Sequence, residues 1–198
     1  LIKSFRHNPR NINTLSSDTI TSISIGRDNI VWVGAIGPIL NKVDLSNSVI
    51  NHYPLLNSRK LSGGKFPKDG IDHIYEDHNS KVWIGTRYGL IEFDKKLKGK
   101  SLVQIDSNMH LYNSGYFIFE DTDSKLWLGS DGQGLIEFDK DNKKLIRYLG
   151  DETISSIVSD KFGKLWIGTY TNGIIEFDPK SKIYKYFTIK DGLSSNMI

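Results

Sequence analysis

The chain has 198 residues, of which 38% are hydrophobic and 25% charged, as expected of a soluble globular protein with a sizeable core. A net charge of +3 is too small to indicate nucleic-acid binding, and the absence of cysteine excludes disulfides, a thiol nucleophile and cysteine-ligated zinc. The sequence contains no apolar run long enough to span a membrane and no signal peptide. Because the first residue is Leu1 rather than methionine, we expect a piece of a longer protein whose targeting and membrane segments lie elsewhere.

A repeated motif organises the chain. Its clearest copy, DKFGKLWIGTYTNGIIEFD at 160–178, places two short apolar segments around a polar loop, which predicts a β-hairpin. Related copies lie at 121–139, 77–94 and, with more substitutions, 26–44. Each copy holds one of the four tryptophans at the same place: Trp32, Trp83, Trp127 and Trp166. Their spacings of 51, 44 and 39 residues indicate a unit of about 40 residues, the length of a propeller blade.

In chain order, each copy predicts four short strands. We expect residues 1–7 to be the last strand of a preceding blade, blades at about 20–53, 71–106, 115–149 and 154–188, and a next blade opening at 191–198. The strands are expected at 20–25, 30–35, 39–44 and 48–53; 71–77, 81–86, 89–94 and 101–106; 115–121, 125–130, 134–139 and 144–149; 154–160, 164–169, 173–178 and 182–187. Helical periodicity is absent, so the expected fold is all-β: one β-propeller fragment over 1–198, with about four four-stranded antiparallel blades.

Several repeated positions have a clear physical role. The glycine two residues after each tryptophan leaves room for a neighbouring backbone or ring. An aspartate six residues before the tryptophan (Asp77, Asp121 and Asp160) opens a tight turn, where its carboxylate is expected to accept backbone N–H bonds. Consecutive aliphatic residues such as Leu135 and Ile136 predict a sheet that is covered on both faces.

These residues resemble the two-component-regulator propeller repeat. The pattern D-x-x-[GS]-K-[LV]-W-[ILV]-G-[TS]…G-[LI]-I-E-F-D, followed by D-G-L-S-S-N, covers essentially the whole chain, and only the first copy departs from it, at Gly26 and Val43. The resemblance implies part of a propeller that is typically seven-bladed, so four blades would leave two open inter-blade faces. It also implies the periplasmic sensor half of a hybrid two-component regulator, whose parent chain is a histidine kinase and whose ligands are polysaccharide breakdown products.

A four-stranded meander brings the loop between its second and third strands to the same end as the link to the next blade. We call this end the upper face. The ligand-binding residues expected there are Arg87, Tyr88, Asp131, Gln133, Tyr170 and Asn172. Aromatic rings beside amide and carboxylate groups suit a carbohydrate, which has apolar ring faces and directional hydroxyls. The alternative is that these are solvated loop residues without a ligand.

The opposite end, the lower face, carries the hairpins between third and fourth strands and is rich in lysine. A basic rim can bind an anionic polymer, although lysines at hairpin tips are usually just exposed to solvent. The glutamates Glu92, Glu137 and Glu176 recur on the third strand. Paired carboxylates can hydrolyse glycosides, but one per blade at the same place favours a repeated structural hydrogen bond. No histidine spacing or calcium-loop pattern is complete, so we expect no metal, no cofactor and no catalytic residue.

The leading functional hypothesis is a non-catalytic sensor propeller that binds an oligosaccharide or other small polar ligand and shifts the equilibrium of an attached kinase. The first alternative is a propeller glycosidase or lyase, which would turn over the ligand that a sensor binds unchanged. The second is a protein–protein interaction scaffold, including a homodimer formed through propeller faces or edges. We expect no nucleic-acid partner, and a membrane only through other parts of the parent chain.

Overall fold

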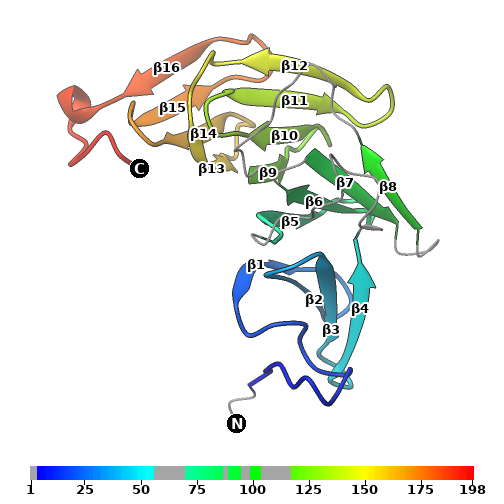
Figure 1. Ribbon diagram of the computed structural model, residues 1–198. Coiled ribbons are helices and arrows are strands. Elements are labelled where there is room, and N and C mark those ends of the chain that lie inside the picture. Colours follow the sequence, from blue (N-terminus) through cyan, green and yellow to red (C-terminus); the bar gives the residue numbers. More distant parts are fainter. Residues whose placement is uncertain (1–3, 56–69, 87–88, 95–98, 104–116) are drawn as a thin grey trace, which may run out of the picture. The chain divides into compact units, whose positions relative to one another are not determined.

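The computed structural model describes residues 4–55, 70–86, 89–94, 99–103 and 117–198 (Figure 1). Within these ranges the regular structure is β, apart from one short 3-10 helix, Ile189–Asp191. Sixteen strands form four antiparallel sheets of four strands each, which confirms the expected fold class. The chain separates into two compact units, Leu1–Val103 and Gln104–Ile198, with two sheets in each. In the part of the chain that the structure describes, no helix has the length and apolarity needed to cross a bilayer.

The first unit holds two meanders. The first sheet consists of β1 (Ile20–Ile25), β2 (Ile30–Ala35), β3 (Ile39–Asp44) and β4 (Val49–Pro54), and the second of β5 (His73–Glu76), β6 (Val82–Thr86), β7 (Gly89–Asp94) and β8 (Gly99–Val103). The bounds of β1 to β3 agree with the prediction to the residue. β8 begins two residues earlier than predicted, and residues 104–106 lie outside the described ranges.

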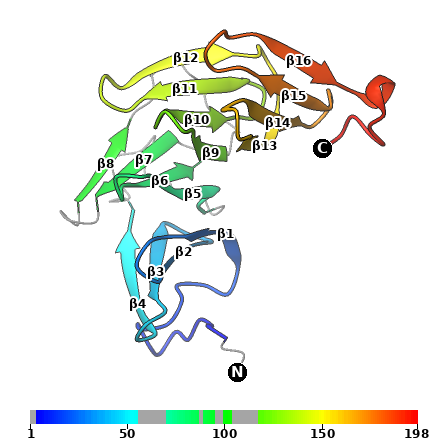
Figure 2. The same cartoon turned by 180° about the vertical axis from the view of Figure 1, so that it is seen from behind.

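The second unit repeats this arrangement (Figure 2). The third sheet consists of β9 (Phe117–Glu120), β10 (Leu126–Gly129), β11 (Leu135–Asp139) and β12 (Lys144–Tyr148), and the fourth of β13 (Ile154–Ser159), β14 (Leu165–Thr169), β15 (Ile174–Phe177) and β16 (Tyr184–Phe187). In each unit the first strands of the two sheets contact each other, β1 with β5 and β9 with β13. The two sheets of a unit therefore pack with their first strands together, as neighbouring blades do.

The N-terminal segment differs from the expected strand. Of residues 1–7, the described ones form no strand, and His7 makes a single parallel bridge to Leu15. Leu15 is buried in a small cluster with Val33, Val43 and Ile50, against which Phe5 packs. The segment thus contributes side chains to the face of the first sheet that points away from Trp32.

Tryptophan and phenylalanine rings fill the space between the two sheets of each unit. Trp32 meets the ring of Phe93 edge-on at 5.9 Å, and Trp127 meets Phe177 in the same way at 5.5 Å. Both tryptophans are completely buried. Edge-to-face contact is a favourable geometry for aromatic rings and adds to the large apolar area buried by each. Trp32, Trp83 and Trp127 are thus core residues, whereas Trp166 is half-buried.

Glycine in the second strand allows the next sheet to approach closely. A Cβ atom on Gly34 would lie 2.8 Å from the Cβ of Ile71, and one on Gly129 would lie 2.5 Å from Cγ2 of Ile154. Both distances are too short for carbon atoms. The glycine leaves room for a neighbour, as expected, but that neighbour is an isoleucine side chain leading into the next sheet and not a backbone or a ring.

The aspartate at the turn between first and second strands binds both backbone and tryptophan. Oδ1 of Asp77 accepts hydrogen bonds from the backbone N–H groups of Asn79 (3.0 Å) and Lys81 (2.9 Å), as expected. Oδ2 accepts the indole N–H of Trp83 at 2.8 Å, a bond that the sequence pattern did not lead us to expect. In the second unit, Asp121 and Asp160 bind their own tryptophans in the same manner, at 2.7 and 3.1 Å.

In the first copy of the repeat, the indole N–H of the tryptophan has a different hydrogen-bond acceptor. Gly26 stands where the other copies have aspartate, and the indole N–H of Trp32 donates instead to Oε2 of Glu76, on the neighbouring sheet, at 2.8 Å. A Cβ atom on Gly26 would lie 2.6 Å from that same oxygen. The carboxylate of the second sheet thus occupies the space left by the missing side chain, and only glycine leaves enough room for it.

A lysine–glutamate ion pair joins the second and third strands in each of the other three copies. The pairs are Lys81 with Glu92, Lys125 with Glu137, and Lys164 with Glu176. This finding supports the structural interpretation of the recurring glutamate. In the first copy the two positions hold Ile30 and Lys42, so both partners are replaced together.

A double-mutant cycle tests the exchange of carboxylates between the first two sheets. Gly26→Asp alone should destabilise the first unit by crowding Glu76, and Glu76→Ser alone should do so by removing the acceptor of the buried Trp32 indole N–H, each by about 1–3 kcal/mol. Combined, they should recover most of the loss, because the aspartate introduced at position 26 can then accept the indole N–H. Serine is chosen because it precedes Asp160 in the fourth copy. Guanidinium unfolding followed by circular dichroism measures the coupling, and strictly additive losses would refute the exchange.

Burial of His73 makes the stability of the first unit depend on pH. Burial lowers the pKa of His73 from 6.5 to about 4. The unfolded chain therefore binds a proton as the pH falls below about 6.5 while the folded chain does not, so stability should fall between pH 6.5 and 4, by up to about 3 kcal/mol. His73→Phe, which copies Phe117 at the equivalent position of the third sheet, should flatten this part of the stability profile. An unchanged acid slope in urea unfolding would contradict the assignment.

Candidate functional site

The upper face of the second unit is built from two loops and one link. The loops join β10 to β11 and β14 to β15, and the link joins β12 to β13. The link lies between the two loops and hydrogen-bonds to both: the backbone N–H of Gly134 donates to the carbonyl of Glu152, and that of Tyr170 to the carbonyl of Thr153. Two consecutive link residues therefore hold the loops of neighbouring sheets together.

The side chain of Thr153 binds the loop between β10 and β11. Its hydroxyl donates to Oδ1 of Asp131 at 3.1 Å and accepts the backbone N–H of Gly132 at 3.0 Å. The hydroxyl group is thus both donor and acceptor, which orients the carboxylate of Asp131 over the link. Asp131 itself is exposed to solvent.

Glu152 is the centre of a second set of hydrogen bonds. Its two carboxylate oxygens accept from Nδ2 of Asn172, each at 3.0 Å, and Oε1 also accepts from the hydroxyl of Tyr186 at 2.8 Å. Burial of the ring, together with the hydrogen bond to the Glu152 carboxylate, raises the pKa of Tyr186 to about 12. The phenol therefore stays protonated and keeps donating at any physiological pH.

The six predicted ligand-binding residues are only partly brought together. Asp131, Tyr170 and Asn172 gather around the link at 152–153, and Tyr170 is 52% exposed. Gln133 instead accepts a hydrogen bond from Nη2 of Arg147 on β12, at 2.6 Å. The remaining two, Arg87 and Tyr88, lie outside the described residues.

Two residues at the centre of the upper face, Glu152 and Thr153, were not among those predicted. They lie in the link, which has no repeated pattern to single out particular side chains. The placement of inter-blade links on the upper face was the signal that pointed to them.

The C-terminal segment packs on the fourth sheet in the way that the link packs on the third. Ile198 donates its backbone N–H to the carbonyl of Thr169 at 3.1 Å, and Ile154 donates in the same way to Ser130 at 2.9 Å. The N–H of Gly173 in turn donates to the carbonyl of Asn196. That residues 191–198 open a next blade remains a prediction, and this geometry supports it.

Chemically, the upper face offers directional hydrogen bonds and an aromatic surface. Asp131 and Glu152 supply acceptors, Asn172 supplies a donor and an acceptor, and the ring of Tyr170 supplies an exposed apolar face. In the described part of the chain, no group of three or more histidine or acidic side chains could hold a metal ion. These hydrogen-bonding groups and the exposed ring are of the kinds that contact polar ligands.

Glu137, one of the recurring glutamates of the third strands, is bound into its sheet and is poorly suited to acid catalysis. Glu137 accepts hydrogen bonds from Lys125 at 2.7 Å, from Lys182 at 2.9 Å and from the hydroxyl of Tyr148 at 3.0 Å. Burial acts to raise the pKa of Glu137, but these hydrogen bonds outweigh it and hold the pKa below its ordinary value. A general acid needs the opposite shift.

Comparison with protein families identifies the repeat. Residues 148–171, which contain the link, β13 and β14, match the family described as Two component regulator propeller. Over these residues the chain is similar to the two component regulator propeller repeat. The resemblance seen in the sequence is thereby confirmed for the copy that includes Glu152, Thr153 and Tyr170. No match was found among curated proteins.

Solved structures similar to this chain include an extracellular domain, a secretion-system component and a lyase. The extracellular domain of the hybrid two component system BT3049 from B. thetaiotaomicron matches with a TM-score of 0.75 and 21% identity, over 98% of this chain and 25% of that one. PorZ, a surface component of the type-IX secretion system of Porphyromonas gingivalis, matches with a TM-score of 0.72 and 16% identity, over 98% and 31%. Virginiamycin B lyase from Staphylococcus aureus matches with a TM-score of 0.68 and 16% identity, over 85% and 55%.

These structural similarities agree with a partial propeller. Each match is below 25% identity, so it shows a shared architecture and not a shared activity. The chain spans about a quarter of the length of the extracellular domain that it matches.

The hydrogen bond between Glu152 and Tyr186 can be tested through the titration of the phenol. Glu152→Gln removes the negative charge, so the pKa of Tyr186 should fall from about 12 toward 10 while staying above it, because the ring remains buried. A pH titration of ¹³Cζ-labelled tyrosine, with Tyr186→Phe to assign the signal, measures the change. Asp151→Asn, a charge change at the adjacent exposed residue, should leave the titration as it is. Equal shifts in the two variants would contradict a direct contact.

Proposed function

We propose that this chain is part of the periplasmic sensor propeller of a hybrid two-component histidine kinase, and that it binds a glycan-derived ligand without turning it over. Binding shifts the conformational equilibrium of the propeller and so changes the activity of the attached kinase. The observation that carries the proposal is the regulator propeller repeat at 148–171. The similarity to extracellular domains of hybrid two component systems supports it.

The location of the ligand is proposed from the polar cluster on the upper face. Asp131, Tyr170 and Asn172 come from loops of two sheets and are tied to one link, so they form a continuous and pre-oriented set of groups. Sugar hydroxyls can donate to the carboxylates and accept from the amide, and the exposed ring of Tyr170 can cover an apolar sugar face. Arg87 and Tyr88, in the corresponding part of the second copy of the repeat, stay part of the proposal.

An enzymatic function has less support. A lyase is among the structurally similar proteins, but at 16% identity the likeness extends only to the fold. The recurring glutamates are paired with lysine in all three copies that contain them, as in Lys164 with Glu176. A glycosidase requires one carboxyl group that is free to donate a proton, and this pairing works against it.

A role in assembly is the second candidate, because the fourth sheet exposes an apolar face. Val158 and Ile183 on this sheet are 57% and 70% exposed, and Trp166 is half-buried although Trp32, Trp83 and Trp127 are completely buried. A further blade of the same repeat would cover this face, as the fourth sheet covers the third. Light scattering over a range of concentrations would show self-association if a second copy covers it instead.

The ligand proposal is tested by titrating the chain with oligosaccharides from plant and host polysaccharides, using isothermal calorimetry. We expect one class to bind and to be recovered unchanged, and Asp131→Ala and Asn172→Ala each to weaken binding about tenfold, the effect of losing one hydrogen bond to a charged or amide group. Asp141→Ala, at the exposed hairpin tip of the third sheet, is the matched control and should bind normally. Absence of binding, or cleavage of the oligosaccharide, would refute the proposal.

A further inference from the structure

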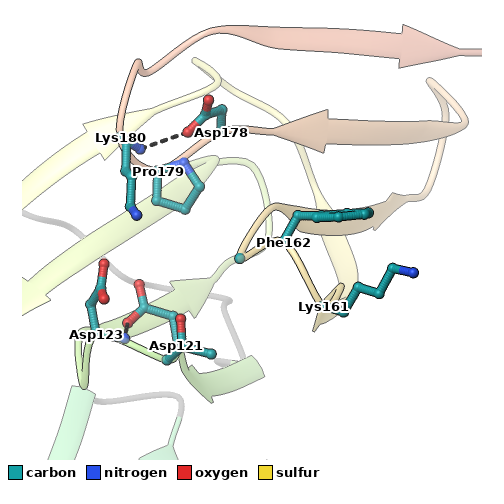
Figure 3. Close-up of a pocket in the computed structure, with 9 residues that line it drawn as sticks. Asp121, Asp123, Lys161, Phe162, Asp178, Pro179 and Lys180 are labelled. Carbon is teal, nitrogen blue, oxygen red and sulfur yellow. Dashed lines mark hydrogen bonds between the residues drawn. The ribbon is translucent and has the colours of Figure 1, made fainter.

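A hollow lies at the lower face of the second unit, at the opposite end of the sheets from the upper-face loops. It has a volume of about 290 Å³ and is formed by three turns (Figure 3). Its lining residues are Asp121, Thr122 and Asp123 of the third sheet and Lys161, Phe162, Gly163, Asp178, Pro179 and Lys180 of the fourth. This volume is at the small end of the range for ligand pockets. Because two sheets supply the walls, groups from different blades can meet one ligand.

Two carboxylates of the hollow are fixed by hydrogen bonds within their own turns. Asp121 accepts two backbone N–H groups and the indole N–H of Trp127. Asp178 accepts the backbone N–H of Lys180 at 2.8 Å, and this bond is the main cause of a pKa below the ordinary value. Asp178 therefore stays negatively charged, and both side chains are rigid parts of the wall.

Two other side chains face the hollow without a bonding partner. Within the described residues, the carboxylate of Asp123 and the ammonium group of Lys180 take part in no side-chain hydrogen bond or ion pair. Figure 3 shows the Lys180 side chain pointing toward the carboxylates of Asp121 and Asp123, which lie on the other sheet. An acid and a base that stand opposite each other, too far apart to pair, are complementary to a molecule that carries both charges.

The remaining wall is apolar. Pro179 is buried at the edge of the hollow between the two sheets, and Phe162 is 76% exposed. Nζ of Lys161 lies 5.0 Å from the centroid of the Phe162 ring, a cation–π contact that keeps this lysine on the far side of the phenylalanine. Figure 3 shows Lys161 and Phe162 extending away from Asp121 and Asp123. Among the charged side chains that line the hollow, those of Asp123 and Lys180 therefore remain to bind a ligand.

We propose that this hollow is a binding site for a small zwitterion, an α-amino acid. Its ammonium group binds the carboxylate of Asp123, its carboxylate binds the ammonium group of Lys180, and its side chain lies against Pro179. A neutral sugar would leave both charges without a counter-charge, whereas an amino acid neutralises both. The site does not depend on the proposed glycan site, because it uses the opposite end of the sheets and none of the same residues.

The test uses the ¹⁵N-labelled chain and three related probes. L-phenylalanine carries both charges, N-acetyl-L-phenylalanine lacks the ammonium charge and L-phenylalaninamide lacks the carboxylate. We expect L-phenylalanine to shift the backbone amide signals of Asp123, Gly163 and Lys180 with saturation in the millimolar range, and each analogue to bind about tenfold more weakly. D-glucose serves as the neutral comparison and should leave these signals in place. Equal binding of the three probes, or binding of D-glucose instead, would overturn the proposal.

Variants separate the site from general surface charge. Asp123→Asn and Lys180→Gln should each weaken L-phenylalanine binding about tenfold. Asp141→Asn and Lys190→Gln change the same charges at exposed residues outside the hollow and should have no effect. Loss of affinity in all four variants, or in none, would show that the hollow is not the site. None of the four should alter oligosaccharide binding at the upper face, so the two proposals can fail separately.

Discussion

The buried indole N–H is the constraint on which the rest of each blade depends. A tryptophan fills the space between two sheets only if its single polar hydrogen finds an acceptor, because an unpaired buried donor costs about 1–3 kcal/mol. Asp121 meets this need with one carboxylate oxygen and fixes the turn before β10 with the other. The same turn places Lys125 immediately before β10, where it reaches Glu137 on β11. One side chain thus links the turn, the core and the pairing of two strands.

The two ends of the sheets have different chemical characters as a consequence. Toward the lower end, carboxylates such as Asp121 and Glu137 are engaged in turns and ion pairs within the sheets. At the upper end the loops are held by a link from the neighbouring sheet, through Glu152 and Thr153. Groups that are held in place before a ligand arrives lose little conformational freedom on binding. Such pre-organised loops on a rigid scaffold are common sites of recognition.

Much of the fold could be predicted because the same residue pattern occurs in several copies along the chain. The strand bounds, the turn aspartates and the space left by Gly34 and Gly129 follow from local pattern and elementary sterics. Contacts between sheets could not be predicted in this way. The sequence does not distinguish Glu76 from other polar strand residues, because its role depends on the packing of its sheet beside Gly26. Glu152 lies in a link that has no repeated pattern. The candidate site was therefore located by topology, while its central residues depend on packing.

The contact between Gly26 and Glu76 restricts the order in which the blades can follow one another along the chain. In the other copies the acceptor for the tryptophan comes from within the same blade, so the blade is self-sufficient. In the first copy the acceptor comes from the adjacent sheet, and each residue is now acceptable only in the presence of the other. A recombination event that separated them would leave an indole unpaired on one side and press two carboxylates together on the other. Mutual dependence of this kind fixes which blade can follow the first one.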